Sequence, residues 1–122
     1  MVSPINGPTA TGPDYTIFEV TWPVLKGIEG EGLLLVPDTP PVADAVVLPD
    51  CDISPEQGAG LHPGVPESAQ VARRLVQNGC RVLIPVLMDR KYTHSGHPDI
   101  IMTNLTHREF IYRAAYELGR HI

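Results

Sequence analysis

The first regular pattern in the chain is an alternation of side chains with a period of two. It begins at Tyr15 and is typical of a half-buried β-strand. The even positions share one face of this strand: Thr16, Phe18, Val20 and Trp22. The glycine-rich stretch "KGIEGEG" predicts a turn, and "LLLVP", which ends at Pro37, predicts a second strand antiparallel to the first. Residues 1–13 lack a periodic pattern and are expected to form a flexible lead-in.

A strand, a helix and a further strand follow in the middle of the chain. "DAVVLP" is apolar almost throughout, as expected for a strand that is covered on both faces. Pro66 suits the first position of a helix and Gly79 suits its end. "CRVLIPVL", from Cys80 to Leu87, predicts the next strand. This spacing favours a right-handed crossover between parallel strands, so the fold class is α/β.

The last helix has a clear start signal. Thr106 and Glu109 have the spacing of a capping box. An apolar stripe at helical spacing then continues to the end of the sequence: Phe110, Ile111, Ala114, Ala115, Leu118 and Ile122. We expect that the sequence is cut inside an element and that the parallel sheet is only half built.

Composition restricts the classes of partner. The 122 residues carry a formal net charge of −5, which argues against a nucleic-acid partner and against a basic contact with a membrane surface. The N-terminus has no signal-peptide pattern, and the sequence leaves the cellular compartment open. Two cysteines are too few for a disulfide framework.

Four stretches in this order resemble the α/β-hydrolase family, in its dienelactone-hydrolase-like and acetyl-xylan-esterase-like branch. They are "AVVLPDCDISPEQ", "ESAQVARRLVQNG", "CRVLIPVLMDR" and "NLTHREFIYRAAYELGRHI". The resemblance implies that residues 14–122 are the N-terminal half of such a domain, with an antiparallel hairpin, a parallel strand–helix–strand unit and a further helix. It also implies hydrolysis of a carboxylic ester or related acyl bond, with a small-molecule or carbohydrate ester as substrate and no cofactor.

The nucleophile elbow of that family, Gly-x-Ser-x-Gly or its cysteine form, is missing from this sequence. The acid and histidine of the family's triad follow the elbow, so we expect the chain alone to be inactive. In this fold, one backbone N–H of the oxyanion hole comes from the loop after the third strand. The resemblance therefore implies that the N–H of Cys51 or of Asp52 is the donor, with the aspartates turning the loop.

A phosphatase is the competing hypothesis. Asp50-Cys51-Asp52-Ile53-Ser54 after a strand resembles the haloacid-dehalogenase-like motif, in which Asp50 would attack phosphorus, Asp52 would be the general acid/base and Mg²⁺ would bridge them. Pro49, directly before the nucleophile position, argues against it. A non-catalytic partial domain that needs a partner segment is a further alternative.

A second polar cluster, "DRKYTHSGHPD", follows the fourth strand at the edge of the sheet where α/β proteins bind ligands. Asp89, Arg90, His94 and His97 are therefore candidates for a substrate-side loop. His-x-x-His in a loop is weak evidence for zinc, and we predict no metal there. His107 is interpreted as a solvated residue of the last helix.

The third strand would form an apolar sheet edge, so we expect the chain to self-associate.

Overall fold

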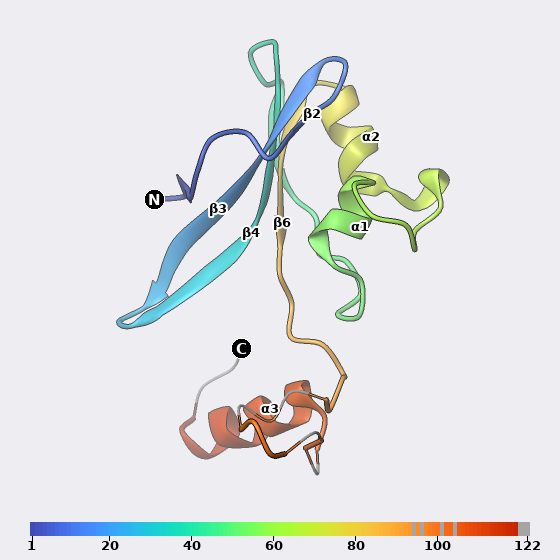
Figure 1. Cartoon of the computed structure of the whole chain (residues 1–122). Helices are drawn as coiled ribbons and strands as arrows, with labels where there is room; N and C mark the ends of the chain where they lie inside the picture. Colours follow the sequence, from blue (N-terminus) through green and yellow to red (C-terminus); the bar gives the residue numbers. More distant parts are fainter. Residues whose placement is uncertain (94, 96, 101, 104, 120–122) are drawn as a thin grey trace. The chain divides into compact units, whose positions relative to one another are not determined.

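The structure is a computed structural model, and it describes residues 1–93, 95, 97–100, 102–103 and 105–119. The chain divides into two units, Met1–Val86 and Leu87–Ile122, and each is described by itself. The first unit contains a mixed sheet with two α-helices, and the second contains one helix (Figure 1). The α/β character predicted from the sequence is therefore confirmed.

The centre of the sheet is a hairpin of β3 (Tyr15–Leu25) and β4 (Ile28–Pro37). The strands are antiparallel, as predicted, but "KGIEGEG" is not a turn throughout. Leu25 pairs with Ile28, so the turn is restricted to Lys26 and Gly27. Gly27 has a φ of +79°, which only glycine adopts without strain.

Two short strands precede the hairpin. β1 (Ser3–Pro4) and β2 (Ala10–Thr11) both pair with β3 in antiparallel orientation. Each is two residues long, too short to leave a periodic signal in the sequence. The lead-in predicted for residues 1–13 thus contains two strands of the sheet.

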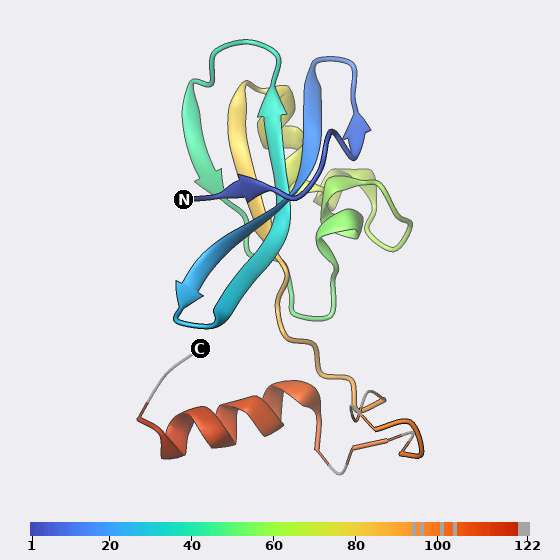
Figure 2. The same ribbon diagram turned by 60° about the vertical axis from the view of Figure 1, so that its left-hand side comes forward.

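The other two strands form the predicted parallel pair. β5 (Ala43–Val46) runs parallel to β6 (Cys80–Pro85), and β6 runs antiparallel to β4. The strand order is β1-β3-β4-β6-β5, which places β5 at the edge of the sheet, beside the yellow β6 in Figure 2. The prediction that this strand is covered on both faces is wrong, because 62% of Val46 is exposed. The expected apolar edge is present.

Three helical segments lie between β5 and β6: α1 (Pro55–Ala59), the 3₁₀ turn η1 (Glu67–Ala69) and α2 (Val71–Gln77). The single helix predicted from Pro66 is therefore interrupted at Gln70, whose ψ of 69° is not helical. The buried side chain of Gln70 donates a hydrogen bond to the carbonyl of Val65 at 3.0 Å. Satisfying this polar side chain inside the protein holds the chain in the interrupted conformation.

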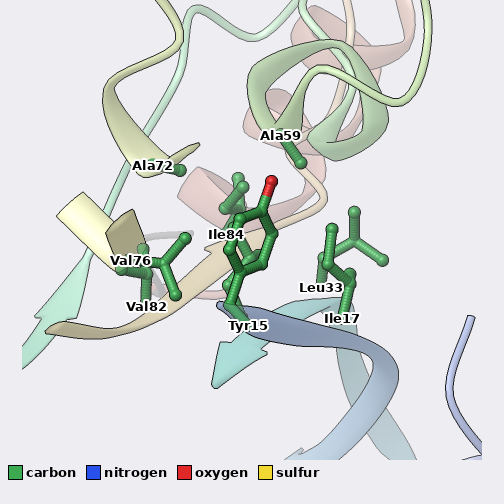
Figure 3. Packing of buried hydrophobic residues seen from close by; sticks show 9 residues of the cluster. Tyr15, Ile17, Leu33, Ala59, Ala72, Val76, Val82 and Ile84 are labelled. Carbon is green, nitrogen blue, oxygen red and sulfur yellow. The ribbon is translucent and has the colours of Figure 1, made fainter. Parts of the chain in front are cut away.

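The core lies between the sheet and α1 and α2, which cover the same face (Figures 1 and 3). Its buried members are Tyr15, Ile17, Leu33, Leu35, Ala59, Ala72, Val76, Val82 and Ile84. The odd positions Tyr15 and Ile17 of β3 thus face the helices. On the even face, Phe18 and Trp22 are only partly buried, whereas Val20 is fully buried. Alternation identified the strand correctly, but the position of the helices decides which of its faces is buried.

The opposite face of the sheet carries an apolar row, defined by Phe18, Leu34, Leu83 and Val46. Phe18 pairs with Leu34, Leu34 with Leu83, and Leu83 with Val46, so the four side chains lie side by side across four strands. Neighbours in register point to the same face, and Leu33 and Ile84 already point to the helices. Within residues 1–86, both α-helices lie on the other side of the sheet.

An ion pair joins β5 to β6 beside this row. The Arg81 guanidinium donates two hydrogen bonds to the Asp44 carboxylate, at 2.8 and 2.9 Å. These bonds hold the pKa of Asp44 below its ordinary value and raise the pKa of Arg81. The contribution of the pair to stability is therefore present at neutral pH and is lost as the pH falls through the lowered pKa of Asp44. Both side chains are exposed, so this contribution is small.

The second unit contains α3 (His107–Glu117). Thr106 caps it by accepting a hydrogen bond from the Glu109 N–H at 3.3 Å, but the Glu109 carboxylate pairs with Arg113 at 2.8 Å. The start signal is thus correct, although Glu109 does not complete the box. The helix ends before Gly119, whose φ is +65°, and Ile122 lies outside the described residues. None of the helices in the described part of the chain is long and apolar enough to cross a membrane.

Candidate functional site

The first candidate site is the loop that leaves β5. Sheet pairing continues one residue past β5, where the Val47 N–H donates to the carbonyl of Leu83 at 2.9 Å. Pro49, which has no N–H to donate, then ends the regular backbone. The loop that follows contains Asp50, Cys51 and Asp52, and it leads into α1.

Asp50 organises this loop. Its side-chain Oδ1 accepts a hydrogen bond from the Asp52 N–H at 3.1 Å, and its carbonyl accepts one from the Ile53 N–H at 2.9 Å. This is the local pattern in which aspartate stabilises a turn through its own side chain. The sequence interpretation that Asp50 turns the loop agrees with this geometry.

Ser54 and Gln57 form a complete capping box at the start of α1. Ser54 Oγ accepts from the Gln57 N–H at 3.3 Å, and Gln57 Oε1 accepts from the Ser54 N–H at 3.0 Å. Pro55 occupies the first helical turn. Sequence analysis overlooked α1, although Ser-Pro-Glu-Gln carries its start signal, because a helix of five residues has no apolar periodicity.

The N–H of Cys51 differs from those of the three residues that follow it. The N–H groups of Asp52, Ile53 and Ser54 all donate within the loop. In the described part of the chain, no acceptor binds the N–H of Cys51. The Cys51 side chain is buried, with its thiol 3.9 Å from Asp52 Oδ1. The two candidate oxyanion-hole donors are therefore not equivalent, because Asp52 donates to Asp50.

The same residues are the one potential metal-binding group among the described residues. One ligand atom each from Asp50, Cys51 and Asp52 lies within 4.8 Å of the others. Carboxylate oxygens are suitable ligands for Mg²⁺, whereas a thiolate is too soft for that ion. Two carboxylates could hold Mg²⁺ only with water or substrate oxygens completing its shell.

The second candidate site, after β6, is brought together only in part. His97 lies beside Asp99, with 4.0 Å between Nδ1 and Oδ2, and its Nδ1 accepts from the Asp99 N–H at 3.2 Å. Asp89 instead contacts His107, and Arg90 is exposed in the same turn. His94 lies outside the described residues. The contacts of the described members are therefore those of His97 with Asp99 and of Asp89 with His107.

The contacts of His107 contradict the prediction that it is a solvated residue. Its Nδ1 lies 2.8 Å from Asp89 Oδ1, and only 22% of its side chain is exposed. The backbone joins the same two segments, because His107 N–H donates to the carbonyl of Lys91 and Arg108 N–H donates to that of Asp89. His107 is thus held at the base of the 89–107 segment rather than solvated. The two partners are eighteen positions apart in the sequence, so no local motif indicates this contact.

Two of the hollows among the described residues lie away from these groups. One, of about 330 Å³, lies on α3 and is lined by Glu109, Tyr112, Arg113, Tyr116 and Glu117. The other, of about 180 Å³, is lined by Ile5, Glu19, Val20, Glu31, Gly32, Leu33, Glu56 and Val86. Neither is lined by the loop after β5. Sites for drug-sized ligands usually enclose about 300–1,000 Å³, so the second hollow is small for an ester of a carbohydrate.

Comparison with known proteins gives a structural match. No protein-family model and no curated protein matches the sequence. Over 98% of its length, the chain superimposes on the crystal structure of a protein from Bacteroides fragilis NCTC 9343 provisionally named an acetyl xylan esterase, with a TM-score of 0.66. The chain has an esterase-like fold.

The likeness concerns the fold alone, because the two sequences are 18% identical. The chain spans 33% of the length of the Bacteroides protein. Within this esterase-like fold, the loop after β5 and the 89–107 segment both follow the carboxyl ends of parallel strands. Ligands of α/β proteins bind at the carboxyl ends of parallel strands, so each segment is by itself a candidate functional site.

Proposed function

We propose that the chain is the N-terminal part of an α/β-hydrolase, in the dienelactone-hydrolase-like and acetyl-xylan-esterase-like branch. The whole protein would hydrolyse carboxylic esters or related acyl bonds. The observation that carries the proposal is the superposition of 98% of the chain on a hydrolase-like neighbour three times as long. The substrate class is a small-molecule or carbohydrate ester, and the triad would come from residues that follow this chain.

The contribution of this chain to catalysis would be one hydrogen-bond donor. The N–H of Cys51 meets no acceptor among the described residues, whereas the N–H of Asp52 donates to Asp50. A backbone N–H aimed at the tetrahedral intermediate stabilises the negative charge that develops on the carbonyl oxygen. The nucleophile itself is missing, since the sequence contains no Gly-x-Ser-x-Gly or Gly-x-Cys-x-Gly.

The proposal is tested by comparing the 122-residue chain with the whole protein encoded by its gene. The whole protein should hydrolyse p-nitrophenyl acetate and be labelled by a fluorophosphonate probe, and the chain alone should do neither. Labelling of Ser54 or Ser95 in the isolated chain would contradict the assignment of the nucleophile to another segment. A whole protein without esterase activity would contradict the proposed function.

The phosphatase hypothesis gives a separate prediction for Asp50. If Asp50 only stabilises its loop, neither the unmodified chain nor Asp50→Asn should bind Mg²⁺ detectably. Asp50→Asn should also melt close to the unmodified chain, because the amide oxygen still accepts from the Asp52 N–H. Asp50→Ala, the matched variant, should cost about 0.5–1.5 kcal/mol of unfolding free energy. Calorimetric titration with Mg²⁺ and thermal melting check both. Mg²⁺-dependent cleavage of a phosphomonoester that Asp50→Asn abolishes would establish the phosphatase instead.

A further inference from the structure

A long connection without regular structure joins β6 to α3. β6 ends at Pro85 and α3 begins at His107, and the described residues between them form no helix and no strand. Connections longer than about 12–15 residues are uncommon in compact domains, and those that keep a defined conformation are usually functional. This connection also leaves the carboxyl end of a strand in a parallel pair, where ligands of α/β proteins bind.

Hydrogen bonds hold the two ends of the 89–107 segment together. His107 Nδ1 lies 2.8 Å from Asp89 Oδ1, and because a carboxylate only accepts, Nδ1 is the donor whether the ring is neutral or protonated. The His107 N–H donates to the carbonyl of Lys91 at 2.8 Å, and the Arg108 N–H donates to that of Asp89 at 3.1 Å. We call the side-chain contact between Asp89 and His107 the clasp.

The described interior of the segment is also closed on itself. The Thr103 N–H donates to the carbonyl of Tyr92 at 2.7 Å, and the Ile100 N–H donates to that of His97 at 3.2 Å. Ser95 Oγ accepts from the His97 N–H at 3.1 Å and donates to the carbonyl of Ile100 at 2.5 Å. A surface loop whose ends meet and which binds its own groups has the arrangement of an Ω-loop, and such loops are frequently functional.

Burial makes the clasp the stronger of two histidine–aspartate contacts in the segment. Only 22% of the His107 side chain and 30% of the Asp89 side chain are exposed, so water competes little for their hydrogen bond. His97 and Asp99 lie 4.0 Å apart and are 58% and 89% exposed, and an exposed pair of this kind contributes little. Hydrogen bonds to a charged group are the stronger ones, so the clasp is the contact that should hold the segment.

We propose that Asp89 and His107 are positioning residues, whose contact fixes the 89–107 segment in the conformation that binds substrate. This inference rests on the proposed function, which supplies the substrate. The clasp lies at the base of the segment and acts through it, so it serves substrate binding and leaves the chemical step to other groups. Without the clasp, the binding conformation would be a smaller fraction of the population, and the apparent affinity would fall by that fraction.

Hydrogen exchange in the whole protein encoded by its gene tests the clasp itself. His107→Phe keeps the backbone N–H and a planar ring but removes Nδ1. Peptides that contain Thr103 should then exchange about tenfold faster or more, the factor expected when a hydrogen bond to a charged group is lost. His107→Asn, whose amide nitrogen can replace Nδ1, should restore most of the protection. His62→Phe, at an exposed histidine of the first unit, is the matched control and should change nothing there.

Steady-state kinetics with p-nitrophenyl acetate tests the role in binding. His107→Phe should raise KM by about tenfold and leave kcat within about twofold, because the loss concerns substrate binding and not the transition state alone. His107→Asn should return KM toward that of the unmodified protein. Asp89→Ala removes the same contact from the other side and should behave like His107→Phe. Circular dichroism melting identifies any variant that fails to fold, and the second variant then carries the test.

Three results would overturn the inference. Unchanged exchange in the folded variants would show that the clasp does not hold the segment. Faster exchange with an unchanged KM would give the clasp a purely structural role, and a loss confined to kcat would place the pair in the chemical step. Each of these results requires an active protein. A whole protein that is inactive in every form contradicts the proposed function instead, and the substrate role of the clasp with it.

Discussion

Replacing Cys51 by proline in the whole protein should reduce kcat for ester hydrolysis by about 100-fold or more, the usual loss when one oxyanion-hole donor is removed. Proline has no backbone N–H, so this substitution deletes the donor itself. Cys51→Ala is the matched control, because it keeps the N–H while removing the thiol. That variant should lose little activity if Cys51 is only a small buried side chain.

Proline at position 52 separates the two possible donors. Asp52→Pro removes an N–H that already donates to Asp50, so it should disturb the turn and affect kcat less than Cys51→Pro. Steady-state kinetics with p-nitrophenyl acetate measures both variants, and circular dichroism melting identifies any that fail to fold. A large loss with Asp52→Pro and normal turnover with Cys51→Pro would assign the donor to Asp52.

Replacing Gly32 by alanine should strongly destabilise the sheet. A Cβ at this position would lie 2.2 Å from the carbonyl oxygen of Ile84 and 2.9 Å from the Cα of Pro85. Both atoms belong to the backbone of β6, so no flexible side chain can move aside. Overpacking of this kind costs about 1–3 kcal/mol, and more where the backbone must shift. For a small domain that corresponds to a fall in Tm of roughly 10 °C.

Gly7 is the matched control for this substitution. An added Cβ at Gly7 would meet nothing within 4 Å, so Gly7→Ala should melt within about 2 °C of the unmodified chain. Thermal melting by far-ultraviolet circular dichroism compares the two variants under the same conditions. Equal melting temperatures would mean that β4 and β6 do not approach as closely as the structure shows.

Local signals in the sequence predicted most elements of the sheet. Alternation located β3, a run of apolar residues located β6, and the spacing between "DAVVLP" and "CRVLIPVL" indicated the parallel pair. Each of these signals extends over several residues of one element, which is why it can be seen without a structure. β1 and β2 were not predicted, because a strand of two residues is too short to show a periodic pattern.

Contacts that depend on side-chain orientation or on the packing of several elements decided what the sequence patterns could not. The buried face of β3 follows from where α1 and α2 lie, and the break at Gln70 follows from its contact with Val65. For the candidate site, the pattern at Asp50 predicted a turn correctly. Which N–H is left available depends on a side-chain orientation that no spacing encodes. The Asp89–His107 contact likewise needs the fold of the whole 89–107 segment.

The place of β5 in the strand order also affects how the chain folds during synthesis. β3 and β4 are joined by a two-residue turn, and such hairpins close in about 1–10 µs. β5 pairs with no strand made before it, because its neighbour β6 comes after residues 47–79. At about 5–20 residues per second, a ribosome needs roughly 2–7 s to make that stretch. Throughout this interval β5 is available to chaperones and to other nascent chains, while the hairpin next to it in sequence is already closed.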